Sequence, residues 1–193
     1  RPLLFPLPAL LELVLVSTSG LVPEILDWVS VPWGVVSLTE SERAEAETPE
    51  QLNAIYAAMH AKVMASFAEF AARLPEDGGD RRLLGTSGTV TTLASVYLKL
   101  NSYDRRAVDG LYLPTAAMRE ISRELARRDI DGRAEFPTIG HERADLVVAG
   151  CAILEAIFDI WPGERLGVAD RGIREGILRA LMASDAKRRN RRN

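Results

Sequence analysis

The chain has 193 residues, of which 47% are hydrophobic and 26% charged, with a formal net charge of -3 and one cysteine. This composition predicts one folded domain with a substantial core, and the slight acidic excess argues against a general nucleic-acid-binding protein. No stretch reaches the ~20 apolar residues that span a bilayer, and a lone cysteine cannot form an internal disulfide, so we expect a cytoplasmic protein that does not enter the membrane.

Three short apolar segments open the chain, at residues 3–5, 13–16 and 25–31. Prolines or a Ser-Thr-Ser-Gly break separate them, which predicts an antiparallel meander of strands. A long helix is expected next, because Thr48-Pro49-Glu50-Gln51 supplies an N-cap, a first-turn proline and a capping-box partner. Apolar residues then recur at three-and-four spacing over 52–74, as on the buried face of an amphipathic helix.

The second half of the chain alternates strands and helices. Strands are predicted at 82–84 and 165–169, and helices behind a glycine-rich loop, from near Pro114, over 142–160 and after Gly172. The order β-β-β-α-β-α-α-α-β-α predicts an α/β domain with a single mixed sheet covered by helices. We expect this domain to span residues 1–185 and to be followed by a basic tail at 186–193.

The strongest functional signal is the run Gly85-Thr86-Ser87-Gly88-Thr89, which lies between the strand at 82–84 and the next helix. Glycines let backbone N–H groups turn toward an anion, and the start of a helix adds unpaired donors and the positive end of its dipole. The run therefore predicts a phosphate-binding cradle. The same pattern is typical of an ordinary strand-to-helix turn with a hydroxyl N-cap, and the local sequence leaves both interpretations open.

Other candidate residues give weaker signals. Arg143 either reaches a phosphate or pairs with Asp145 at the start of a helix, and the pattern favours the pair. His60 and His141 have no third ligand at metal spacing, which argues against a zinc site. Cys151 lies in an apolar run and is expected to be a buried, inert thiol.

Four sequence blocks carry a family resemblance: residues 85–94, 103–110, 143–150 and 170–178. In this order they closely resemble the exopolyphosphatase and guanosine pentaphosphate phosphatase family. The resemblance implies the second lobe of that family's catalytic core, which has the ribonuclease-H-like fold of actin and the sugar kinases. It also implies a Mg²⁺-dependent phosphohydrolase that releases the terminal phosphate of polyphosphate or pppGpp, and it is compatible with a homodimer.

The resemblance gives Glu12 a role in orienting Mg²⁺ or water, whereas the pattern alone describes a solvent-facing strand residue. The segment 6–12 departs from the family, because prolines and leucines stand where a second phosphate loop has glycines and hydroxyls. The family's first lobe, with the glutamate expected to activate water, is absent from this chain. We therefore expect the chain alone to bind phosphate but to be a poor enzyme. The alternative is a non-catalytic phosphate- or nucleotide-binding module.

Overall fold

The computed structural model describes residues 11–20, 23–42, 46, 48–75, 82–172, 178 and 181–182. The strands among these residues are β1 Leu11–Ser17, β2 Glu24–Val31, β3 Leu83–Gly85, β4 Tyr112–Pro114 and β5 Arg165–Val168. They form two sheets: an antiparallel hairpin of β1 and β2, and a three-stranded sheet in the order β3-β5-β4. In the second sheet β3 runs parallel to β5, whereas β4 runs antiparallel to it.

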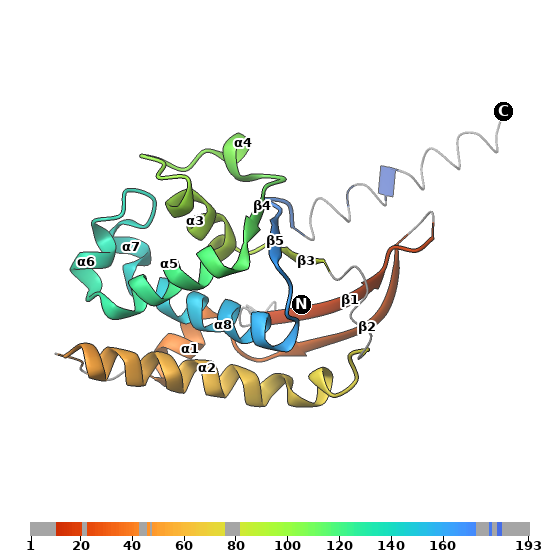
Figure 1. Cartoon of the computed structure of the whole chain (residues 1–193), viewed down its shortest axis with the longest axis horizontal. Helices are drawn as coiled ribbons and strands as arrows, with labels where there is room; N and C mark the ends of the chain where they lie inside the picture. The colour runs from red at the N-terminus through yellow and green to blue at the C-terminus, as the bar shows by residue number, and fades with distance from the viewer. Residues whose placement is uncertain are drawn as a thin grey trace, which may run out of the picture.

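The helices surround a central one. They are α1 Val35–Ser41, α2 Pro49–Ala71, α3 Gly88–Tyr97, α4 Arg105–Val108, α5 Thr115–Arg127, α6 Ile130–Ala134, α7 Gly140–Ala144 and α8 Val147–Ile160. Helix α8 contacts α1, α2, α3 and α5, and it is buried over most of its length. Figure 1 shows α8 between the long α2 on one side and α3 and α5 on the other. An apolar helix that is buried all round is suited to this central place.

Helix α2 begins where the sequence predicts. The backbone N–H of Gln51 donates to Thr48 Oγ1 at 3.3 Å, and the Gln51 side chain accepts from the Thr48 N–H at 3.0 Å. This reciprocal cap satisfies two helix-terminal donors, and such caps are worth about 1 kcal/mol. The predicted apolar stripe supplies the buried residues of this helix, which are Met59, Val63, Phe67 and Phe70.

Each sheet has a strand edge without a partner among the described strands. Strand β1 pairs only with β2, and β3 pairs only with β5. Both strands contribute to one cavity, which Leu11, Leu13, Leu83 and Leu84 help to line. This cavity therefore lies between the two sheets.

Several predictions need correction. The described strands form two sheets, whereas a single mixed sheet is expected. One strand of that expected sheet, at 3–5, lies outside the described residues, so the single sheet stays a prediction. The helix predicted over 142–160 is divided into α7 and α8 by a turn, in which the Leu146 N–H donates to the Arg143 carbonyl three residues earlier at 3.1 Å. The short strand β4 was not predicted.

Some predictions fall partly outside the described residues. The strand predicted at 3–5 lies there entirely, as do the altered segment at 6–10 and the tail at 186–193. In the helix predicted after Gly172, only Leu178, Leu181 and Met182 are described as helical, so the domain boundary at 185 stays a prediction.

Two further expectations concern burial and membranes. Cys151 is buried in α8, as predicted, and burial raises the pKa of its thiol to about 12. None of the helices that the structure describes combines the length and the apolar character needed to cross a bilayer.

Candidate functional site

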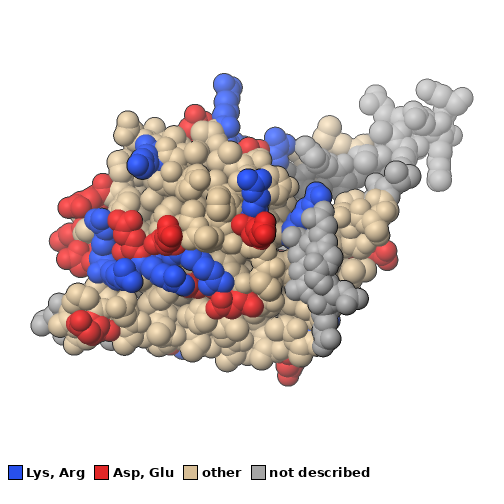
Figure 2. Space-filling view, viewed as in Figure 1, with Lys and Arg blue, Asp and Glu red and all other residues tan. Residues whose placement is uncertain are grey.

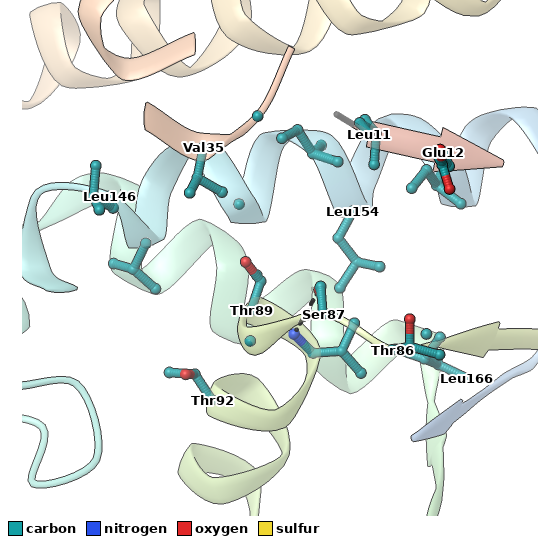
Figure 3. A pocket seen from close by; sticks show the side chains of 18 of the residues that line it. Leu11, Glu12, Val35, Thr86, Ser87, Thr89, Thr92, Leu146, Leu154 and Leu166 are labelled. Carbon is teal, nitrogen blue, oxygen red and sulfur yellow. Dashed lines mark hydrogen bonds between the residues drawn. The ribbon is translucent and has the colours of Figure 1, made fainter. Parts of the chain in front are cut away.

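A cavity of about 550 Å³ brings together the residues that the sequence assigns to phosphate or Mg²⁺ binding. It is lined by Glu12 on β1, by the loop Gly85–Thr89 after β3, and by Arg143 on α7. Figure 3 shows Glu12 and the loop on opposite sides of this space, with Leu154 of α8 between them. Residues that are more than a hundred positions apart in the chain thus share one cavity, which the sequence alone did not establish.

The loop passes directly into helix α3. Ser87 is the N-cap, and its Oγ accepts a hydrogen bond from the Val90 N–H at 3.3 Å (Figure 3). The Ser87 carbonyl accepts from the Thr91 N–H at 3.2 Å. Neither the Gly88 nor the Thr89 N–H has a hydrogen-bond partner among the described residues. The hydroxyl cap and the anion cradle are therefore compatible, because the cap uses one donor and leaves the first two of the helix open.

The two glycines of the loop serve different purposes. A Cβ at Gly85 would lie 2.6 Å from Cγ2 of Val90, so the packing of β3 against α3 requires a glycine there. A Cβ at Gly88 would meet no atom within 4 Å. The protein's own packing therefore does not demand a glycine at 88, and its absent side chain leaves the helix N-terminus open to the cavity.

A third glycine, which the sequence analysis missed, holds α3 close to α8. A Cβ at Gly150 would lie 2.2 Å from Oγ1 of Thr89 and 2.7 Å from its Cγ2. Thr89 can occupy its place in the loop only because α8 has no side chain at this point. The signal was available, since an isolated glycine inside an apolar helical run often marks a close approach.

Arg143 does not form the favoured pair with Asp145. Its Nη1 donates instead to Thr92 Oγ1 at 3.4 Å, which connects α7 to the second turn of α3. The side chain is exposed and lines the cavity near the loop. This long hydrogen bond leaves most of the guanidinium donors available, since an arginine carries five N–H groups.

Glu12 is an exposed residue on β1, as the strand pattern predicts, and its register partner on β2 is Ser30. The Ser30 hydroxyl is buried and has no hydrogen-bond partner among the described residues. Most of the remaining cavity wall is apolar, with Ile153, Leu154 and Ile157 of α8 at its base. The polar groups are thus confined to the two sides of the cavity.

The described residues contain no group of three or more His, Cys, Asp or Glu side chains placed to hold a metal ion. Glu12 is the one carboxylate among the described residues that line the cavity. His60, which the sequence did not assign to zinc, forms an ion pair with Asp159 at 2.8 Å. A structural zinc site is therefore not found in this part of the chain.

The four sequence blocks meet in pairs. The first and third join where Arg143 contacts Thr92 and Gly150 contacts Thr89. The second and fourth join at Asp109, which accepts from the Asp170 N–H at 3.0 Å and from Arg171 Nε at 3.4 Å. The Asp170 N–H, and then Arg171, hold the pKa of the Asp109 carboxyl below its usual range.

Comparison with known proteins identifies the family to which this chain belongs. The model of the Ppx/GppA phosphatase family matches residues 11–185. A protein of Haemophilus influenzae described as a putative exopolyphosphatase is 27% identical over 104 residues, which cover 53% of this chain and 30% of that protein.

Solved structures show the same fold. A Ppx/GppA family member from Aquifex aeolicus has a TM-score of 0.68 and 23% identity over 90% of this chain and 57% of its own. An exopolyphosphatase from Cytophaga hutchinsonii has a TM-score of 0.72 and 17% identity over 92% of this chain and 55% of its own. The chain thus spans little more than half the length of these solved structures, and less of the curated relative.

Proposed function

Because the chain belongs to the Ppx/GppA phosphatase family, we propose that it binds the terminal phosphates of inorganic polyphosphate or pppGpp at Gly85–Thr89 and contributes this wall to their hydrolysis. The observation that carries the proposal is the single cavity that gathers Glu12, this loop and Arg143. A phosphate at the loop would accept from the open N–H groups of Gly88 and Thr89, and the dipole of α3 would favour its negative charge.

Arg143 is the one cationic side chain among the described residues that line the cavity. It is exposed, lines the cavity, and makes only a 3.4 Å hydrogen bond to Thr92. Planar guanidinium groups bind phosphate oxygens through two parallel hydrogen bonds, which are stronger than bonds between neutral groups. We therefore assign Arg143 to substrate binding rather than to a structural pair.

Glu12 is the residue we assign to Mg²⁺ or to the attacking water. Mg²⁺ keeps several waters in proteins and takes one or two carboxylates together with substrate phosphates, so a single carboxylate on the cavity wall fits this ion. When bound, Mg²⁺ would neutralise charge on the transferred phosphate. Glu12 would hold the ion or orient water from the side of the cavity that faces the loop.

We expect this chain alone to bind phosphate chains but to turn them over slowly. Phosphoryl transfer depends on charge stabilisation from several directions around the phosphate. The described wall offers one carboxylate, one guanidinium and neutral donors. Binding should then fall near the millimolar range, because each net hydrogen bond is worth roughly 0.5–1.5 kcal/mol.

The test is calorimetric titration of tripolyphosphate and pppGpp with Mg²⁺, beside an assay of phosphate release. The Gly88→Val variant should abolish binding at the loop, because its side chain would occupy the open space in front of the N–H groups. Ala116→Val, an exposed change near the start of α5, is the matched control for placing a β-branched residue in a first helical turn.

Three outcomes test where phosphate binds and whether the described wall is sufficient for catalysis. Loop binding that disappears with Gly88→Val and persists with Ala116→Val supports the cradle. Loop binding that survives Gly88→Val places the cradle elsewhere. Turnover near ~10 s⁻¹, a typical enzyme value, would show that the described wall belongs to a complete active site.

A further inference from the structure

A second hollow, of about 520 Å³, lies on the side of α8 away from the cavity. Ile153, Leu154 and Ile157 face the cavity, whereas Glu155 and Asp159 line this hollow. The walls come from α2 and α5, so three helices build the hollow. It has no lining residue in common with the cavity that holds the glycine loop.

Three arginines of α5 line one wall of the hollow. Arg119, Arg123 and Arg127 follow one another at four-residue intervals on α5, which places them in one row along the helix. Figure 2 shows Lys and Arg side chains gathered in a band across the region that α5 occupies in Figure 1, with carboxylates at its margins. A neighbouring hollow of about 450 Å³ shares Arg123 and Arg127, so these two side chains stand between both hollows.

Both carboxylates of the hollow already have hydrogen-bond partners among the protein's own side chains. Glu155 accepts from the Tyr56 hydroxyl at 2.5 Å, from Arg119 at 3.3 Å and from Arg123 at 3.0 Å. Asp159 accepts from Arg119 at 2.6 Å and is paired with His60 at 2.8 Å. Arg119 thus bridges the two carboxylates through both of its terminal nitrogens.

Arg123 and Arg127 keep donors to spare. Arg123 uses one N–H group on Glu155, and Arg127 makes no hydrogen bond or ion pair with any described residue. Both side chains are exposed, and each guanidinium has five N–H donors. Three arginines face two carboxylates in this hollow, which leaves a surplus of one positive charge among its lining residues. Glu120 and Glu124 line the neighbouring hollow that Arg123 and Arg127 share.

We propose that this hollow is a second oxyanion site, in which Arg123 and Arg127 bind a phosphate group of an inorganic phosphate chain. The site is independent of the glycine loop and goes beyond the function proposed for it. It differs chemically, because it offers arginine side chains alone, whereas the cavity combines backbone N–H groups with Arg143. Binding here should weaken steeply with added salt, since exposed charges are screened within about 10 Å at 0.1 M.

The experiment is calorimetric titration of tripolyphosphate into the full chain without divalent cations, at low and high salt. Gly88→Val should leave one salt-sensitive binding event, and adding Arg127→Ala should weaken that event about threefold to tenfold. Arg106→Ala is the matched control, because Arg106 is an exposed arginine on α4 with no ion pair among the described residues. It should change the residual event by less than twofold.

Glu120→Gln separates binding from a structural role. Glu120 lines the neighbouring hollow beside Arg123 and Arg127, so removing its negative charge should tighten binding of the probe. A merely structural arginine row predicts no such gain. If Gly88→Val fails to fold, the unmodified chain should show two events, of which Arg127→Ala weakens only the salt-sensitive one. A Gly88→Val chain that folds but binds nothing, or an Arg127→Ala variant with unchanged binding, would overturn the proposal.

Discussion

The two sides of α8 carry different polar groups: open backbone N–H groups with one arginine on the cavity side, and a row of arginines paired with carboxylates on the other. The cavity side has the N–H groups of Gly88 and Thr89 and the Arg143 guanidinium beside a wall of Ile and Leu. The opposite side carries Glu155 and Asp159 in a network of ion pairs. Backbone donors are fixed by the fold and carry no net charge, whereas side-chain charges must be balanced before they can be buried. One helix therefore separates a site shaped by close packing from a site shaped by charge balance.

The largest expected effect is on the charged side. Glu155→Ala removes the acceptor for Tyr56, Arg119 and Arg123, and it leaves their donors without a partner beside α8. The Glu155 side chain is only 9% exposed, so we expect the free energy of unfolding to fall by about 3 kcal/mol. Denaturant unfolding followed by circular dichroism measures this.

Glu120→Ala is the control for that change, because this exposed glutamate of α5 has no ion pair among the described residues. Its unfolding free energy should change by less than about 0.5 kcal/mol. Equal losses for the two variants would mean that the network contributes nothing beyond a surface charge.

A smaller effect is expected on the cavity side. Gly150→Ala places a Cβ against Thr89, so α3 and α8 must move apart. Overpacking of this kind costs about 1–3 kcal/mol, and it should also weaken the binding of tripolyphosphate to the loop. Thermal unfolding and calorimetry of the same variant measure both losses.

Relief of the clash provides the control. Thr89→Ala combined with Gly150→Ala should recover part of the lost stability, because it removes the contacts to Oγ1 at 2.2 Å and Cγ2 at 2.7 Å and leaves only the Cβ of residue 89, at 3.0 Å. Gly88→Ala, which introduces a Cβ where no atom lies within 4 Å, should leave stability nearly unchanged. A double variant no more stable than Gly150→Ala alone would contradict the proposed contact.

The smallest expected effect is on how the free energy of unfolding depends on pH. Burial raises the pKa of Asp159, but hydrogen bonds from Arg119 and His60 outweigh it and hold this pKa below the usual range of an aspartate. A depressed carboxyl pKa stabilises the fold above the unfolded pKa, and this stabilisation is lost as pH falls through the folded pKa. Asp159→Asn should therefore reduce stability at neutral pH and make it less sensitive to acid below about pH 4.

The size of this pH effect is limited by solvent. The Asp159 side chain is 38% exposed, so its pairs should be worth less than about 1 kcal/mol. Unfolding at pH 7 and at pH 3 for both proteins gives the comparison. An identical pH dependence in the two would show that Asp159 does not titrate with folding.

Sequence reasoning succeeded where local chemistry decides the structure. The cap at Thr48 and the apolar stripe behind it specify α2, and the glycine loop followed by hydroxyls specifies the turn into α3. Both signals lie in one continuous stretch of sequence, so they can be read without knowing a distant partner.

Sequence reasoning failed where distant partners decide. The pairing of β3 with β5 joins residues about eighty positions apart. Nothing in the sequence of either strand indicates which strand it pairs with. Arg143 had an acid two residues away, yet its contact is Thr92 on another helix. The division between α7 and α8 falls at Asp145 and Leu146, which keep αR backbone angles but form a turn between the two helices. Such choices depend on packing rather than on local preference.

The free edges of β1 and β3 have a consequence for how this protein behaves before it is fully folded. Backbone N–H and C=O groups along such an edge accept any extended chain as an added strand. Among the described strands, β1 and β3 each keep such an edge, and leucines of both strands line one cavity. Wherever these edges are unpaired during synthesis or refolding, two copies of the chain would exchange strands along them, and the protein concentration governs how often that happens.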